Sequence, residues 1–379
     1  MNKHFLILLL LAFAGCSTER KNDGKIGNFQ FSYELDTIHI DSKGEFFFLN
    51  NGLSGSTLSQ SGELYIFNRP QLRLEIIDLD KKQLKDTVKF EVEGPNGIGA
   101  LGINMINLTE SGDFYFSSFT GLRQMDASGN LKRFINWDNE ERIQDQLGTG
   151  KLISFDGIIS RDGSKFYGTY SAEGRGGSSM ADGLAIIDLK SLELKSIEVP
   201  KLSALKEFKI ELDIDGMKTT SGDSYDLLLN DSKLIISQGS INGISVYDLV
   251  KDTLVTYDYQ TELLPAAKPG NFQRKVATME AFQEASTQRS KEPLFGDFMY
   301  DPENNLYYRI SFLKDLNPDG NIDWKGVLSI FDEEFNLLHE EEGMGRYLGR
   351  KFIRDGKIYR FINIEDEMAF EVLTPTVNR

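Results

Sequence analysis

Apolar residues fall in short runs along the chain, and tight polar turns separate these runs. One signal recurs: apolar residues lead into an Asp, and a Leu follows five or six residues later. Short runs rich in aromatic and β-branched residues predict β-strands, and a signal that recurs at long intervals predicts repeated supersecondary units. The aspartates of this repeat are Asp78, Asp126, Asp188, Asp248 and Asp332.

Aligning this signal with the polar turns gives six units of four strands, which we call A to D in chain order within each unit. The sixth unit reaches the end of the chain one strand short. In the first unit the predicted strands are 53–59, 64–67, 74–77 and 84–92. The B strands predicted for units three to six are 166–170, 234–237, 306–311 and 358–362.

The missing strand of the sixth unit has a candidate near the N-terminus. Residues 33–40 alternate polar and apolar positions as a strand does. Pairing them with the last unit leaves no exposed sheet edge. The predicted fold is therefore all-β, a six-bladed β-propeller whose ring is closed by an N-terminal strand, in one domain covering residues 29–379. A seven-bladed ring is the alternative, since residues 45–50 could belong to an extra blade.

The long connections of the chain all fall on one predicted face. In a four-stranded meander, the A–B and C–D turns lie at one face, and the B–C and D–A connections lie at the other. Loops on a rigid scaffold commonly carry function, so the face with the long connections is the predicted binding face. These connections are 139–151, 171–182, 200–223, 260–295 and 312–325. Within them we expect a helix at 272–290, with Phe272, Val276, Met279 and Phe282 on one side.

The repeated Asp has a local explanation. A carboxylate at this place in a turn accepts hydrogen bonds from backbone N–H groups about two residues further on. This accounts for the Asp in all five units without a catalytic role, and we interpret these residues as structural.

The N-terminus has the features of an export signal. Lys3 gives it a basic start, and the apolar run that follows, 5–14, is too short for an ordinary membrane span. The run leads through small residues into Cys16, which resembles the lipobox of bacterial lipoproteins. This resemblance implies that residues 1–15 are removed and that Cys16 carries the lipid anchor.

Residues 16–28 are polar and predict a flexible tether between the membrane and the folded body. Ser17, directly after the Cys, resembles the sorting signal of lipoproteins sent to the outer membrane. Whether the body faces the periplasm or the cell surface stays open. Cys16 is the only cysteine, so the chain forms no internal disulfide and no Cys-based metal site.

Charge and histidine content limit the function. The chain has 58 Asp and Glu against 42 Lys and Arg, which argues against a nucleic-acid partner. Of its three His, His4 belongs to the signal, while His39 and His339 fall away from the predicted binding face. A His-based triad or zinc site has little to build from. No spacing singles out a catalytic residue, and we expect a binding protein rather than an enzyme.

A candidate calcium loop lies in the connection 312–325. Oxygen ligands recur at positions 1, 3, 5 and 9, with Gly320 at position 6. The pattern resembles the calcium loops of EF-hands and of integrin-type propellers, but position 12 is Gly326 where an EF-hand has Glu. A structural Ca²⁺ is one interpretation, and a plain β-turn is the other. The candidate ligands are Asp315, Asn317, Asp319 and Asp323.

Four further residues are candidate ligand contacts. Arg69 and Arg309 lie in or after predicted B strands, which lead to the predicted binding face, although strict alternation would point Arg309 between blades. Trp324 could stack on a sugar. Asn96 lies in the Gly-rich connection 91–99, whose backbone could approach a central channel, although a structural turn also explains it.

The body of the chain resembles lipoproteins of Bacteroidota that carry a six-bladed, TolB-like or NHL-like propeller domain of unknown function. The resemblance implies a fold and a membrane-anchored location, and it transfers no catalytic residue. It rests on the lipobox and on segments 61–65, 76–80, 93–97 and 307–309.

The sequence thus predicts a membrane-anchored binding module whose loop-bearing face holds a glycan, a peptide or a protein. The alternative is a calcium-dependent propeller hydrolase or lactonase. In that class the resemblance implies calcium in the central channel, whereas the candidate loop of this chain is peripheral, which favours binding.

Overall fold

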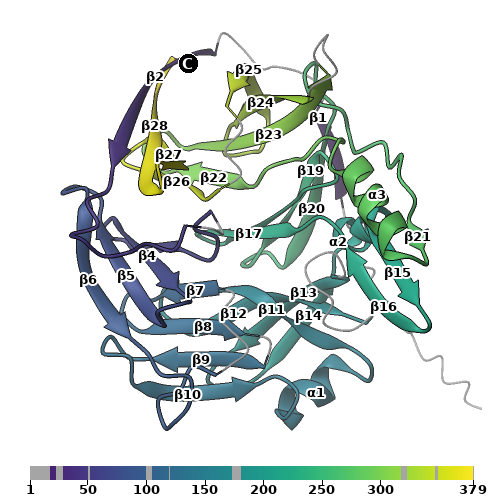
Figure 1. The fold of residues 1–379 in the computed structure, drawn as a ribbon. Helices are drawn as coiled ribbons and strands as arrows, with labels where there is room; N and C mark the ends of the chain where they lie inside the picture. The colour runs from purple at the N-terminus through teal and green to yellow at the C-terminus, as the bar shows by residue number, and fades with distance from the viewer. Residues whose placement is uncertain are drawn as a thin grey trace, which may run out of the picture.

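A computed structural model describes residues 18–22, 29–49, 52–99, 105–118, 120–172, 181–316, 322–345 and 349–378. Within these residues the fold is all-β with a few short helices. Six antiparallel four-stranded meanders, sheets 1 to 6 in chain order, are accompanied by one separate three-stranded sheet. In Figure 1 the sheets follow one another around the molecule, from β4–β6 at the left past β7–β10 at the bottom to β22–β25 at the top.

The first three sheets follow the order of the predicted units, although the first strand, predicted over 53–59, spans only Thr57–Leu58. Sheet 1 consists of β3 (Thr57–Leu58), β4 (Glu63–Asn68), β5 (Arg73–Asp78) and β6 (Gln83–Lys89). Sheet 2 consists of β7 (Met105–Leu108), β8 (Phe114–Ser118), β9 (Gly121–Met125) and β10 (Leu131–Asn136). Sheet 3 consists of β11 (Leu152–Ile159), β12 (Lys165–Ser171), β13 (Gly183–Asp188) and β14 (Leu194–Glu198).

The last three sheets have the same order, except that the sixth takes its outer strand from the N-terminus. Sheet 4 consists of β17 (Tyr225–Asn230), β18 (Lys233–Gln238), β19 (Gly243–Asp248) and β20 (Thr253–Tyr259). Sheet 5 consists of β22 (Phe298–Asp301), β23 (Leu306–Leu316), β24 (Ile322–Phe331) and β25 (Leu337–Met344). Sheet 6 consists of β26 (Lys351–Arg354), β27 (Lys357–Ile364), β28 (Glu367–Asn378) and β2 (Gln30–His39).

The predicted pairing of the N-terminal strand with the last unit is present. β2 runs antiparallel to β28 from Gln30 opposite Asn378 to His39 opposite Ala369. Residues 45–49, considered above for an extra blade, form no strand, and the Glu45 carboxylate instead pairs with Arg73 of β5.

Apolar side chains on both faces of the sheets hold neighbouring sheets together. Because side chains alternate along a strand, a sheet buried on both sides carries apolar residues on both faces. Clusters of buried residues join sheets 1 and 2, 2 and 3, 3 and 4, 4 and 5, and 5 and 6. A further cluster joins sheet 6 back to sheet 1 and includes Leu64, Ile77, Phe352, Tyr359 and Phe370.

The structural role predicted for the repeated Asp is confirmed. In each C–D turn its carboxylate accepts backbone N–H groups two to four residues further on, as Asp126 does from Ser128 and Asn130 at 2.9 Å. These backbone hydrogen bonds lower the carboxyl pKa at four of the five positions: Asp78, Asp126, Asp188 and Asp248. The fifth residue, Asp332, accepts from Glu334 and Asn336 in the same way.

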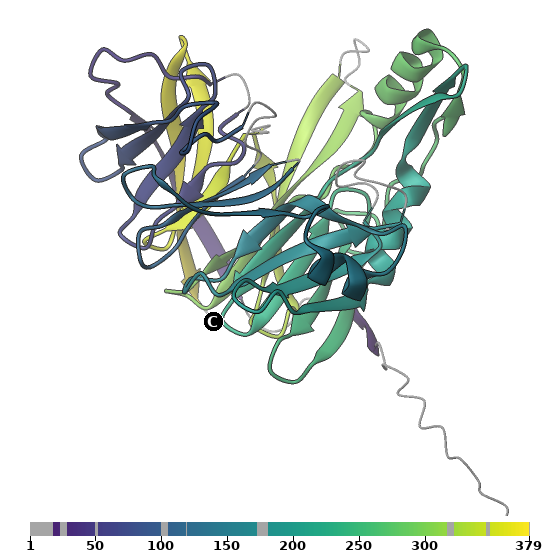
Figure 2. The same cartoon turned by 90° about the horizontal axis from the view of Figure 1, so that it is seen from below.

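The long D–A connections carry the helices and the separate sheet. α1 (Glu141–Leu147) precedes sheet 3, while α2 (Pro200–Ala204) and the 3₁₀ helix η2 (Leu205–Phe208) precede sheet 4. β15 (Ile210–Ile214), β16 (Met217–Ser221), β21 (Lys275–Val276) and α3 (Met279–Arg289) form a unit that we call the insertion module. Figure 2 shows this module projecting from the body of the molecule.

The helix predicted over 272–290 is shorter than expected. α3 begins at Met279, because the Thr278 hydroxyl accepts the N–H of Ala281 and caps the helix there. Val276 belongs to β21 instead, and it pairs in parallel with Leu212 of β15. The predicted apolar contact survives this change, because Phe272 and Phe282 still pack with Val276 in one cluster.

The connection 312–325, predicted as a loop, is largely a hairpin. β23 and β24 continue through it, and their pairing runs to Leu316 opposite Ile322. The backbone N–H and C=O groups of the segment are satisfied by this pairing, which is why it is not a free loop.

The segment predicted as a tether also contains a strand. β1 (Thr18–Asn22) pairs in parallel with β20 at the outer edge of sheet 4. Cys16 lies outside the described residues. No helix in the described part of the chain has the length and apolar character needed to span a membrane.

Candidate functional site

A cavity of about 920 Å³ is lined by residues of the six four-stranded sheets or of their A–B turns, and we call it the central cavity. It opens among the A–B turns, at the end opposite the predicted binding face. Its polar rim includes Gln60, Glu110, Arg161 and Asp231. The first strands of the sheets line it with mainly apolar side chains, including Leu58, Leu108, Leu228, Tyr300 and Ile353.

Charged side chains gather on the same first strands, at the end where the D–A connections enter. Asp226 is the second residue of β17, and Asp297 directly precedes β22. Arg350 directly precedes β26, and Lys351 is its first residue. Together with Asp156 of β11, these five residues form what we call the inner-strand cluster.

Strand alternation explains why residues of different sheets face one another. Asp226 shares a face of β17 with Leu228, which packs against sheet 5. Lys351 shares a face of β26 with Ile353, which also packs against sheet 5. Both side chains are therefore directed toward the sheet that carries Asp297.

The two central carboxyl groups hold protons more tightly than usual. Burial raises the pKa of Asp226 to about 8, the Asp297 carboxylate adds to this shift, and Arg350 opposes it. The pKa of Asp297 is also raised, because surrounding protein removes part of the water around its carboxyl group even though the side chain is exposed, and the charges of Lys351 and Arg350 oppose this shift. Asp226 is therefore largely protonated at neutral pH and can donate a hydrogen bond.

Asp156 belongs to sheet 3, and its carboxyl group lies next to Tyr225 of the neighbouring sheet 4. Burial raises its pKa to about 6. Its charge acts on the buried Tyr225 hydroxyl, whose pKa lies well above the usual value mainly because of burial. That hydroxyl is 2.7 Å from the hydroxyl of Thr169. These contacts fix the wall of the site beside Asp156.

Lys351 and Arg350 supply the positive charge. Burial lowers the pKa of Lys351, and its Nζ donates to the Gly349 carbonyl at 3.3 Å. The Arg350 backbone N–H donates to the Gly52 carbonyl at 2.8 Å, which holds β26 against the first unit. The buried Nε of Arg350 has no hydrogen-bond partner within the described residues, so one donor is left for a ligand.

The cluster therefore combines a neutral acid, carboxylates and two cationic groups in one place. Such a set can hold a small polar ligand, and a pair of carboxyl groups with raised pKa values also suits proton transfer. Within the described residues, no three His, Cys, Asp or Glu side chains come together as a metal-binding group.

The residues predicted from the sequence lie elsewhere and apart from one another. Arg69 is exposed in the turn after β4. Asn96 has a structural role, because its Oδ1 accepts the Leu131 N–H at 3.0 Å and its Nδ2 donates to Asn130 at 3.2 Å. The structure thus favours the turn interpretation of the connection 91–99.

Arg309 is buried, with 1% of its surface exposed, rather than lying on the loop-bearing face. Its guanidinium donates to Asn242 Oδ1 and lies 5.4 to 6.0 Å from the centroids of four aromatic rings. This corrects its assignment as a ligand contact, since strand alternation turned it between sheets 4 and 5. The rings belong to Tyr259, Phe295, Phe298 and Phe331.

Trp324 and the candidate calcium loop belong to the β23–β24 hairpin. Trp324 packs against the cluster between sheets 5 and 6, with the Lys314 ammonium 5.1 Å from its ring centroid. The backbone places Asp315 directly opposite Asp323. Asn317 and Asp319 lie outside the described residues.

The sequence does contain a signal for the inner-strand cluster. An Asp recurs four or five residues before the A–B turn in three successive units, as Asp156, Asp226 and Asp297. Because the units superimpose in the fold, residues at one place in the repeat come together at one place on the first strands. The Asp that recurs in the C–D turns is more conspicuous in the sequence, and the series on the first strands was therefore not recognised.

Structural comparison finds similar proteins in Bacteroides. A member of the DUF4221 family from Bacteroides vulgatus matches over 92% of this chain and 99% of its own, with 16% identity and a TM-score of 0.67. A Bacteroides fragilis protein proposed to be exported matches over 96% and 100%, with 9% identity and a TM-score of 0.52. Both likenesses concern the fold alone, and they fit the resemblance to Bacteroidota proteins.

A gluconolactonase from Xanthomonas campestris is more distant, with 12% identity and a TM-score of 0.42. The match covers 90% of this chain and 89% of the gluconolactonase, and it supports no inference about activity. A comparison with curated protein sequences finds no significant match. The model of a domain of unknown function, DUF4221, matches residues 28–342, which is most of the folded body. The chain therefore belongs to the DUF4221 family.

Proposed function

We propose that this protein is an exported, lipid-anchored binding module built on a six-bladed β-propeller. The six sheets are its blades, and β2 closes the ring by supplying the outer strand of the last blade. Three observations support this: the meander order of the sheets, the clusters that join each sheet to the next and sheet 6 to sheet 1, and the cavity lined by residues of the six sheets or of their A–B turns.

The inner-strand cluster is the proposed binding site, on the first strands of sheets 3 to 6, where the D–A connections enter. The observation that carries this proposal is the convergence of charged groups from four successive first strands, with raised pKa values at Asp156, Asp226 and Asp297. A rigid β scaffold has no structural need for such costly groups at one place, so a ligand is the better explanation. The ligand class is a small polar molecule with an anionic group for Lys351 and hydrogen-bonding groups for Asp226.

A ligand panel tests this proposal. The probes are amino acids, dicarboxylates and sugar acids, screened by saturation-transfer NMR on the lipid-free body and followed by calorimetry. Binding of a hit should be lost in Asp226→Asn and Lys351→Met and kept in Asp145→Asn, which changes an exposed Asp of α1. A hit that binds all three variants equally would place the site elsewhere, and a panel without any hit would count against a small polar ligand.

A hydrolase is the second candidate, favoured by the adjacent Asp226 and Asp297 carboxyl groups. One neutral and one ionised carboxyl are the usual pair for general acid and base. δ-Gluconolactone and p-nitrophenyl acetate are suitable substrates, each with calcium and with a chelator. Turnover abolished by Asp226→Asn and Asp297→Asn would establish an enzyme, and its loss with the chelator would add calcium. No turnover under either condition would leave binding as the function.

Membrane attachment has its own test. Lipid on Cys16 should hold the full-length protein in the outer membrane, with residues 17–28 leading to the body. We expect Cys16→Ser to move the protein to the soluble fraction and to abolish metabolic labelling with palmitate. Protease added to intact cells then shows which side of the membrane the body faces. A Cys16→Ser protein that stays in the membrane would contradict lipid anchoring.

A further inference from the structure

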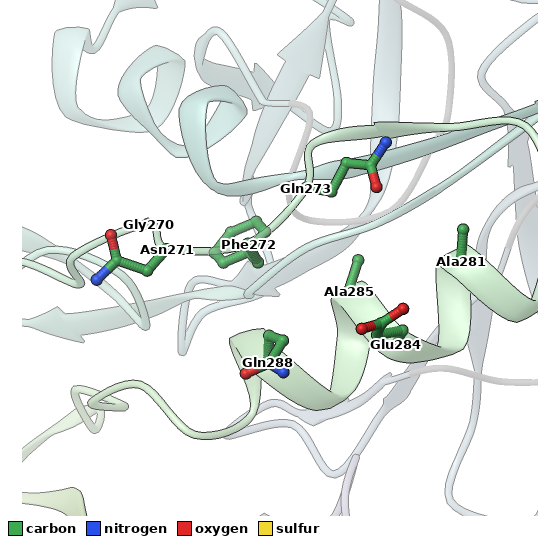
Figure 3. Close-up of a pocket in the computed structure, with 8 residues that line it drawn as sticks. All are labelled: Gly270, Asn271, Phe272, Gln273, Ala281, Glu284, Ala285 and Gln288. Carbon is green, nitrogen blue, oxygen red and sulfur yellow. The ribbon is translucent and has the colours of Figure 1, made fainter.

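A groove of about 580 Å³ crosses the insertion module between α3 and the segment that leads into β21 (Figure 3). One wall is Gly270 to Gln273. The other is a single face of α3, where the lining residues are spaced three or four apart. That face carries Ala281, Glu284, Ala285 and Gln288.

The groove is held in shape by its own hydrogen bonds. The buried Glu292 carboxylate accepts the N–H groups of Gly270 at 3.1 Å and Asn271 at 2.6 Å. On the other side, β21 pairs with β15, which fixes the chain beyond Gln273. The wall that carries Phe272 is therefore pinned at both ends and pays little ordering cost when a ligand binds.

The side chains of the groove define the ligand chemistry. Figure 3 shows Phe272 turned into the space between the two walls. The side chains of Asn271, Glu284 and Gln288 have no hydrogen-bond partner within the described residues and can turn to a ligand. No cationic side chain lines the groove, and Glu284 repels anions.

We propose that this groove is a second binding site that takes a neutral oligosaccharide. The apolar C–H face of a sugar ring covers Phe272. The amides of Asn271 and Gln288 donate to and accept from neighbouring hydroxyls, and the Glu284 carboxylate accepts from them. The site is separate from the inner-strand cluster, and it adds a ligand class that the cationic groups of that cluster do not favour.

Calorimetry with defined probes tests the inference. The probes are maltohexaose, cellohexaose, xylohexaose and mannohexaose, with a hexamer of galacturonic acid as the anionic comparison. At least one neutral hexamer should bind, and the anionic hexamer should not. No binding by any neutral hexamer, or equal binding of the anionic one, would overturn the proposal.

Matched variants locate the site. Gln288→Ala and Asn271→Ala remove exposed groups without touching the core, and each should weaken binding about five- to tenfold, the effect of one hydrogen bond. Phe272→Ala should weaken it further, provided that its thermal unfolding shows a folded module. Gln283→Ala changes an exposed residue of α3 outside the groove and should leave the affinity unchanged. Binding that survives the groove variants overturns the assignment.

The proposals for the two sites can be tested and refuted independently of each other. Asp226→Asn should leave oligosaccharide binding intact, whereas Gln288→Ala should leave binding at the inner-strand cluster intact. Loss of oligosaccharide binding in Asp226→Asn alone would place the sugar at the inner-strand cluster and refute the groove.

Discussion

Asp223 and Lys268 form an ion pair that joins the two ends of the insertion module to sheet 4, with side-chain exposures of 12% and 3%. The Ser240 hydroxyl also donates to Asp223 at 2.6 Å. Arg289, at the end of α3, donates to the Ser221 carbonyl at 2.6 Å. Asp223 lies only three residues before Asp226, so the module is anchored beside the strand that carries the proposed site.

Breaking this pair should be costly. Lys268→Met leaves the Asp223 carboxylate buried without its main partner, and we expect a loss of about 3–5 kcal/mol in unfolding free energy. Urea denaturation followed by tryptophan fluorescence measures it. Lys275→Met, at an exposed position of β21, should change stability by less than about 0.5 kcal/mol. Equal stability of the two variants would show that the pair does not anchor the module.

The inner-strand cluster should make stability depend on pH. The folded-state pKa of Asp226, about 8, lies above its ordinary value of 3.8, so the folded protein binds this proton more tightly than the unfolded chain does. Its contribution is therefore fully present below about pH 4 and is lost as the pH rises through about 8. Asp297 acts in the same direction.

Asp226→Asn isolates this effect. The amide cannot ionise, so the melting temperature of the variant relative to the native protein should increase from pH 5 to pH 9. Scanning calorimetry at pH 5, 7 and 9 measures the difference, with Asp145→Asn as the control that shows no such trend. A difference that stays constant across this range would mean that the Asp226 pKa is not raised.

How far the sequence predicted this molecule depends on the range of the interactions involved. The turn at Asp126 depends only on the next four residues, so the local sequence pattern was enough to predict it. The pairing of β2 with the last sheet was predicted because the last unit of the repeat lacks one strand. Arg309 and Asp226 depend on which neighbouring sheet a side chain faces, and that requires strand phase to be known to one residue. The start of α3 was missed because a parallel pairing with β15, more than 60 residues earlier, competes with helix formation at Val276.

Arg309 should contribute to stability rather than to binding. Burial lowers its pKa to about 10, so it stays charged at neutral pH among its four aromatic neighbours. Arg309→Ala removes these contacts and leaves a cavity, at a cost of about 3–5 kcal/mol. Arg309→Met fills the space and should cost less. Arg69→Ala, at an exposed position, serves as the control in the same urea series, and a comparable loss there would contradict the contrast between core and surface.

Removal of β2 tests the proposed closure of the ring. Its ten paired residues cover the edge of β28, and Ile38 and Ile40 belong to the cluster that joins sheets 6 and 1. A chain that begins at residue 41 exposes a long strand edge, so we expect aggregation or a large loss of thermal stability, measured by light scattering and calorimetry. A chain that begins at residue 29 keeps β2 and lacks only β1, and it should remain folded and monomeric. If both shortened chains melt at the same temperature, β2 is an appendage and the sheets do not depend on it for closure.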